Sequence, residues 1–132
     1  MYLVDTSVWI DYFREKNNSA VEKFHYLLDR NIPFGLNGTI YQEILQGAGD
    51  ERDYKQLKEY LESQRFYHPK NILKSHEAAA MLFLRCRKKG ITIRSSIDCY
   101  IAQTAIEHKL LLLHNDKDFE KMHSVVKELT LA

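Results

Sequence analysis

The sequence predicts an α/β protein, a three-layer α/β/α sandwich with a mostly parallel central sheet. Short apolar runs of strand length alternate with longer segments whose apolar residues recur at helical spacing. Four consecutive leucines at 110–113 are flanked by polar residues, which is typical of a central parallel strand that is buried on both faces. The 132 residues contain no repeat, low-complexity tract or linker, so we expect one domain over residues 1–132.

The strands are expected where short apolar runs lie between helical segments. They cover residues 2–4, 33–36, 66–67, 110–113 and 128–131. The helices are expected where apolar residues recur every three or four positions. They cover residues 5–13, 20–30, 39–47, 50–64, 75–89, 96–106 and 116–123. Because strands and helices alternate, neighbouring strands are expected to run parallel.

Polar side chains at several helix starts suit N-terminal capping. Asp5-Thr6-Ser7 lies at the start of the first helix, and Ser96 opens the helix over 96–106. Thr39 and Gln42 have the spacing of a capping box. In the helix over 50–64, three residues at helical spacing are expected to face inward: Tyr54, Leu57 and Leu61.

Composition excludes several classes of protein. No apolar run approaches the length of about 20 residues that a membrane span needs, and the first residues lack the features of a secretory signal, so we expect a cytoplasmic protein. The net charge of +1 argues against a strongly basic nucleic-acid wrapper but not against a nuclease with a local basic patch. Cys86 and Cys99 lack CxxC spacing, which disfavours a zinc site or a thiol nucleophile.

Four acidic residues are expected at one end of the sheet. Asp5 follows the first strand and Asp116 follows the leucine strand, whereas Glu43 and Asp98 lie in the first turns of helices. Ligand chemistry in parallel sheets gathers beyond the carboxyl ends of the strands. Each acid taken alone has an ordinary alternative role, as a helix cap or as a charge favoured by the helix dipole. Glu43 and Asp98, however, are surplus to the expected caps.

Clustered carboxylates need a counterion. Two of them about 4 Å apart repel by ~4 kcal/mol at an effective dielectric constant of about 20. Mg²⁺ or Mn²⁺ suits a pocket whose ligands are all carboxylates, since zinc prefers histidine and thiolate. Such an ion lowers the pKa of an attacking water and stabilises a leaving oxygen, so phosphodiester hydrolysis is the chemistry we expect.

Three segments resemble the motifs of the PIN-domain family, and especially of its VapC toxins. They are VDTSVWID at residues 4–11, SIDCYIA at 96–102 and LLLHNDKDF at 111–119. The resemblance implies a PIN fold and Mg²⁺- or Mn²⁺-dependent endoribonuclease activity on tRNA or rRNA that leaves a 5′-phosphate and a 3′-hydroxyl. It also implies a homodimer and inhibition by a cognate VapB-like antitoxin.

On this resemblance the catalytic and metal-binding positions are Asp5, Glu43, Asp98 and Asp116. Thr6 or Ser7 would orient the first carboxylate or a water at the metal. Relatives often carry Thr or Ser where this chain has His114, and its imidazole is expected either to contact a substrate phosphate or to support a carboxylate. Asp118 is expected to be a structural acid at a helix start, with metal binding as its alternative role.

Two further segments suggest binding surfaces. The densest basic stretch is Arg85, Arg87, Lys88, Lys89 and Arg94. It is either a solvated helix end or an RNA contact, and Arg94 is the member expected nearest to a phosphate. Trp9, Ile10, Tyr12 and Phe13 give one short helix an apolar surface for the core and for an antitoxin or a second copy.

Two other classes of protein compete with the nuclease. A catalytically silent PIN-like module that binds RNA or protein would keep the fold but not a complete acidic set. A haloacid-dehalogenase-like phosphatase needs a second Asp two residues after the first, where this chain has Ser7. A phosphate-accepting receiver needs a lysine after a late strand, which Lys117 does not match convincingly.

Overall fold

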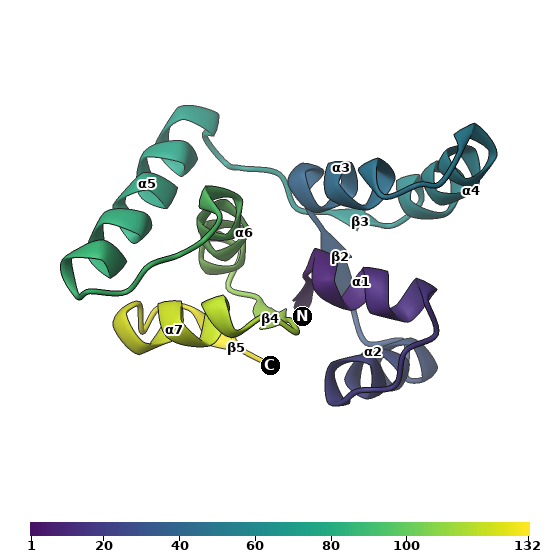
Figure 1. Ribbon diagram of the computed structural model, residues 1–132, viewed down its shortest axis with the longest axis horizontal. Coiled ribbons are helices and arrows are strands. Elements are labelled where there is room, and N and C mark those ends of the chain that lie inside the picture. Colours follow the sequence, from purple (N-terminus) through teal and green to yellow (C-terminus); the bar gives the residue numbers. More distant parts are fainter.

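The computed structural model describes residues 1–132 and has helices gathered about a five-stranded parallel sheet (Figure 1). In chain order the elements are β1 (Tyr2–Val4), α1 (Thr6–Phe13), α2 (Ser19–Asp29), β2 (Phe34–Leu36), α3 (Gly38–Gln46), α4 (Glu51–Glu62), β3 (Arg65–Phe66), α5 (Ile72–Lys88), α6 (Ser96–Glu107), β4 (Leu111–Leu113), α7 (Lys117–Val125) and β5 (Thr130–Leu131). In Figure 1, α5, α6 and α7 form one group and α1 to α4 form another.

The strand order is β3-β2-β1-β4-β5, and every neighbouring pair is parallel. The predicted α/β fold with a parallel central sheet is therefore confirmed. The central strand β1 pairs with β2 and with β4, and the register that joins Val4 to Leu113 brings the carboxyl ends of β1 and β4 together. Ligand sites in such sheets lie beyond these ends, so the register places the segments that follow β1 and β4 side by side.

The leucine run forms the buried strand that its composition predicts. Leu112 and Leu113 are at most 1% exposed, and they join Leu3 and Val4 in the core. A close strand pair needs Gly35 in β2, since a Cβ there would collide with the carbonyl of Arg65 in β3. The buried leucines and the close contact between β2 and β3 hold the short strands in register. This register fixes the edge of the sheet on which the predicted acids lie.

Two helix caps and one helix start differ from the expectation. Asn37 caps α3 by accepting a hydrogen bond from the Ile40 N–H at 2.8 Å, so the predicted capping box from Thr39 is wrong. Ser95 caps α6 in place of Ser96. Asn71 caps α5, which begins three residues before the expected start at 75. In each case a cap was available slightly earlier in the chain.

The outer helix α4 is less buried than its periodicity predicts. Leu61 is fully buried and Leu57 partly so, but Tyr54 is 42% exposed, so its expected inward position is wrong. Helix α4 packs chiefly against α3 and leaves much of its surface in solvent. None of the helices has both the length and the apolar character that crossing a lipid bilayer would require.

Candidate active site

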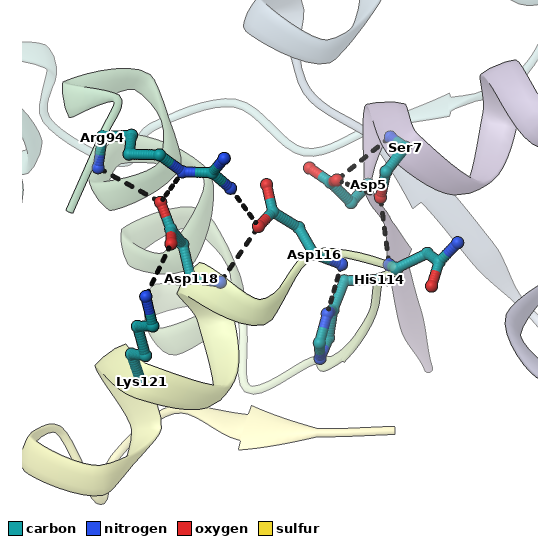
Figure 2. A network of polar contacts seen from close by, with 8 residues as sticks. Asp5, Ser7, Arg94, His114, Asp116, Asp118 and Lys121 are labelled. Carbon is teal, nitrogen blue, oxygen red and sulfur yellow. Dashed lines mark hydrogen bonds and ion pairs between the residues drawn. The ribbon is translucent and has the colours of Figure 1, made fainter.

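Asp5 is held where β1 ends and α1 begins. It caps α1, is only 4% exposed, and its Oδ2 accepts hydrogen bonds from the N–H of Ser7 at 3.0 Å and from its hydroxyl at 2.6 Å. The Ser7 oxygen in turn accepts the N–H of Asn115 at 3.0 Å, from the segment after β4 (Figure 2). Ser7 therefore joins the two segments that follow the central strands and fixes the Asp5 carboxylate between them.

Asp116 has the matching position after β4. It caps α7, and its Oδ1 accepts hydrogen bonds from the Asp118 N–H at 2.9 Å and from Arg94 Nη2 at 3.1 Å. In Figure 2 its carboxylate lies between Arg94 and Asp5. Two donors thus fix one of its oxygens.

Glu43 reaches the same end of the sheet from α3. The hydroxyl of Thr6, the neighbour of Asp5, donates a hydrogen bond to Glu43 Oε1 at 2.6 Å. Thr6 is itself buried, so the bond anchors the carboxylate to the start of α1. Of the two hydroxyls predicted to orient a carboxylate, Ser7 contacts Asp5 and Thr6 contacts Glu43.

Asp98 lies in the first turn of α6 and has the strongest sign of a shared acidic environment. Burial raises its pKa to about 7, and the negative charges of Asp5 and Asp116 add to the rise, with smaller contributions from Glu43 and Asp118. Burial also raises the pKa of Asp5 to about 6, and the charge of Glu43 adds to it although the hydrogen bonds from Ser7 oppose the rise. The fold therefore places Asp98 within reach of the charges of the other three predicted acids.

These acids suit a divalent cation chemically without already forming a cage. As the side chains stand, no three histidine, cysteine, aspartate or glutamate side chains lie together closely enough to hold a metal ion. The donor set consists of carboxylate oxygens, which Mg²⁺ and Mn²⁺ accept. Burial, and then the charges of neighbouring acids, disfavour the ionised forms of Asp5 and Asp98 and raise their pKa values, and a bound cation would offset that cost. A cation would have to draw the carboxylates together on binding.

Asp118 and Arg94 form a pair at the edge of this group. Asp118 is 1% exposed, and its Oδ2 accepts bonds from the backbone N–H and from Nε of Arg94, both at 3.1 Å. Burial by itself would raise the pKa of Asp118, but these bonds outweigh that effect and the pKa falls. Asp118 is thus a paired anion in the first turn of α7. The phosphate contact expected of Arg94 remains a prediction, since its guanidinium lies on two carboxylates.

His114 supports the segment that carries Asp116. Its Nδ1 accepts the N–H of Asp116 at 3.1 Å, and its ring packs against Phe119. Burial lowers its pKa, which favours the neutral imidazole that this bond requires. The contact is to the backbone of an acidic residue, and a phosphate contact remains a prediction.

Sequence reasoning assigned no role to a second polar bridge beside the site. Asp11 Oδ2 accepts hydrogen bonds from Asn115 Nδ2 and from Asn18 Nδ2, both at 3.0 Å. Asn115 thus contacts Ser7 through its backbone and Asp11 through its side chain. The available signal was position, because Asp11 and Asn115 both lie inside the segments that carry the predicted acids. Arg85, by contrast, pairs with Glu128 at 2.6 Å, away from these residues.

The fold and the acidic edge define a class of protein. The family model of the PIN domain matches residues 2–124. The chain therefore belongs to the PIN-domain family, and its curated relatives place it among the VapC-type members. It is 33% identical over 121 residues to "VapC ribonuclease Mb1587" of Mycobacterium bovis, which covers 91% of this chain and 90% of the relative. The same values hold for "Ribonuclease VapC11" of Mycobacterium tuberculosis.

Solved structures share the fold at lower identity. One is VapBC-1 from nontypeable Haemophilus influenzae, with a TM-score of 0.74 and 21% identity over 99% of this chain and 96% of that chain. Another is VapBC2 from Rickettsia felis, bound to a DNA fragment from its promoter, with a TM-score of 0.73, 18% identity and the same coverage. FitAcB from Neisseria gonorrhoeae has a TM-score of 0.67 and 22% identity, covering 92% of this chain and 93% of that chain.

Proposed function

We propose that this protein is an endoribonuclease, the toxin of a toxin–antitoxin pair, and that it uses Mg²⁺ or Mn²⁺ held by Asp5, Glu43, Asp98 and Asp116. The observation that carries the proposal is the register of β1 against β4, which brings Asp5 and Asp116 to one edge of the sheet, where their charges reach Asp98. Relatives over nine-tenths of the chain bear the name ribonuclease, which gives the reaction class. A silent binding module would have no need of this unfavourable arrangement of charge.

The protein's own residues hold the acids in position. Ser7 fixes one oxygen of Asp5, and Thr6 fixes one oxygen of Glu43. Asp98 approaches from α6 and becomes an effective ligand only when ionised, which its pKa of about 7 allows near neutral pH. A divalent ion, when bound, would neutralise these charges, polarise a phosphate oxygen and lower the pKa of water. By holding such an ion, the acids would place positive charge beside a phosphodiester under attack.

The RNA contact is expected at the basic end of α5 and in the loop that follows it. Arg87, Lys88 and Lys89 end α5 in solvent, just before the loop that leads to Asp98. Cations there would attract the RNA backbone, with the salt dependence that phosphate contacts impose. Whether tRNA or rRNA is the target remains a prediction from the resemblance, as does the homodimer.

A VapB-like antitoxin is the partner we expect. Two structural neighbours are VapBC assemblies, VapBC2 of Rickettsia felis and VapBC-1 of Haemophilus influenzae. On this chain, Trp9 is buried against Phe24, while Phe13 and Tyr60 remain about 36% and 40% exposed. A hollow of about 220 Å³ lies beside them, between α1, α3 and α4. The apolar surface predicted for α1 is therefore only partly used by the core, which leaves room for a partner.

The activity is tested on purified protein with total RNA. Fragment ends are sequenced with Mg²⁺ present and with chelator, for the parental chain, Asp98→Asn and Asp29→Asn. Asp29 is an exposed acid at the end of α2 and serves as the matched control. We expect discrete 5′-phosphate ends that need Mg²⁺, persist in the control and vanish in Asp98→Asn. Cleavage at the parental rate by Asp98→Asn would contradict the assigned site, and no cleavage by any sample would favour the silent module.

A further inference from the structure

Arg94 connects two acidic residues that differ sharply in burial. Its Nε donates to Asp118 and its Nη2 donates to Asp116, each at 3.1 Å (Figure 2). Asp118 is 1% exposed, whereas the Asp116 side chain is 27% exposed. One guanidinium therefore ties a buried carboxylate to one that faces the candidate site.

The buried end fixes the guanidinium in place. Asp118 Oδ2 receives both the backbone N–H and Nε of Arg94, and Lys121 Nζ lies 3.9 Å from Oδ1. The Arg94 side chain is 73% exposed, so packing alone would not hold it. Its position depends on Asp118, which connects the loop before α6 to the first turn of α7.

The other end divides the two oxygens of Asp116. Oδ1 accepts from both Arg94 Nη2 and the Asp118 N–H, and no hydrogen bond is made to Oδ2. We propose that Arg94 is a positioning residue, which occupies Oδ1 of Asp116 so that Oδ2 alone faces the cation site shared with Asp98. This inference rests on the proposed function, because it concerns how one of the assigned ligands is presented.

The geometry requires arginine and not only a positive charge. A guanidinium is planar and presents several N–H groups in a fixed fork, so it serves two carboxylates at once. A lysine ammonium keeps the charge but lacks the fork. Arg94→Lys therefore changes the orientation of Asp116 while the local net charge stays the same.

The chain offers a matched control for this change. Arg85 makes a two-point contact with Glu128, from Nη1 at 2.6 Å and from Nη2 at 3.2 Å, between α5 and the segment before β5. Arg85→Lys loses an equivalent fork away from the acids. If the two-point contact of Arg94 served only the stability of the fold, Arg94→Lys and Arg85→Lys would have similar effects on Mn²⁺ affinity.

The test is calorimetric titration with Mn²⁺ of the parental protein, Arg94→Lys, Arg94→Gln, Arg85→Lys and Asp98→Asn, each checked for folding by thermal melting. Residues that orient metal ligands typically contribute about 10- to 100-fold in affinity, so we expect both Arg94 variants to bind Mn²⁺ at least about tenfold more weakly. Arg85→Lys should bind within about twofold of the parental protein, since its fork is remote from the ligands.

Three other outcomes would overturn the inference. Parental Mn²⁺ affinity in Arg94→Lys would overturn the inference and leave the proposed function standing. Tighter binding in Arg94→Gln would show that Arg94 acts only as a repelling charge, which also overturns it. If the parental protein did not bind Mn²⁺, or if Asp98→Asn bound it as tightly as the parental protein, both the inference and the assigned metal site would be overturned.

Discussion

Replacing Asp98 by asparagine should make the metal-free protein more stable while abolishing its activity. Asn keeps the shape of the side chain and cannot ionise. The parental pKa of Asp98 is raised from 3.8 to about 7, by burial and then by the charges of its acidic neighbours. Ionised Asp98 is therefore a cost of the folded state that the amide does not carry.

The pKa values set the size of this effect. Each pH unit between the unfolded and folded pKa is worth roughly 1.4 kcal/mol, so the full penalty is about 4 kcal/mol once Asp98 is ionised in both states. The side chain is half-buried, and solvent screening reduces the expected gain to ~2 kcal/mol. For a chain of 132 residues that corresponds to a rise in Tm of roughly 7 °C.

The sign of the pH dependence follows from the raised pKa. Below the unfolded pKa, both states are protonated and the penalty is absent. It grows as the pH rises from about 4 and is complete above the folded pKa of about 7. The variant should therefore exceed the parent in stability at pH 8 and lose that advantage towards pH 4.

Thermal melting in chelator at pH 4, 6 and 8 measures this difference, with Asp29→Asn as the exposed control. Equal melting of parent and Asp98→Asn at pH 8 would refute the electrostatic reasoning, because it would mean that burial and the acidic neighbours together impose no cost on ionised Asp98. A larger advantage at pH 4 than at pH 8 would give the wrong sign and refute it equally.

Three further predictions concern the ion, a supporting hydroxyl and the sheet. Mg²⁺ should raise the parental Tm more at pH 8 than at pH 5, because protons compete with the ion for Asp5 and Asp98, whose pKa values are about 6 and 7. Scanning fluorimetry at both pH values measures the two shifts in Tm, and equal shifts would contradict the prediction. Ser7→Ala removes the 2.6 Å bond to Asp5 and should slow RNA cleavage about tenfold in initial-rate assays, so a parental rate would remove the positioning role. Gly35→Ala should lower the free energy of unfolding by about 2 kcal/mol in urea titrations, because the added methyl group collides with β3. Gly38→Ala adds a methyl group in open space and should not lower it. Similar free energies of unfolding for the two variants would count against the tight β2–β3 contact.

The sequence predicted the strands and the parallel sheet because the residue patterns that indicate them lie within short segments. The leucine run identified β4, and the alternation of strands and helices indicated the parallel sheet. The parallel arrangement then placed Asp5 and Asp116 at one edge, since each follows a strand that pairs with its neighbour in register. No long-range information was needed for that step.

Two helix caps and the exposure of Tyr54 were not predicted correctly, because the local sequence is compatible with more than one arrangement at these positions. Asn37 and Thr39 are both good caps, as are Ser95 and Ser96, and the backbone angles decide between them. Tyr54 has helical spacing, but the sequence does not reveal that α4 packs chiefly on one other helix. Local patterns cannot resolve such alternatives.

The supporting contacts of the site lie beyond the reach of local patterns for another reason. Arg94 and Asp118 are 24 positions apart in the sequence, and Ser7 and Asn115 are 108 apart. Each partner has an ordinary local explanation as a loop, cap or helix-start residue. Only the register of β1 against β4 and the packing of α6 beside α7 bring them together.

The most direct test of the proposed metal centre is anomalous diffraction at the manganese edge from crystals soaked with Mn²⁺ at pH 8. We expect a strong peak in contact with carboxylate oxygens of Asp98 and of Asp5 or Asp116, with the Arg94 guanidinium still hydrogen-bonded to Asp118. A peak confined to other residues, or no peak in crystals whose acidic edge is open to solvent, would contradict the proposal that these carboxylates form the metal centre.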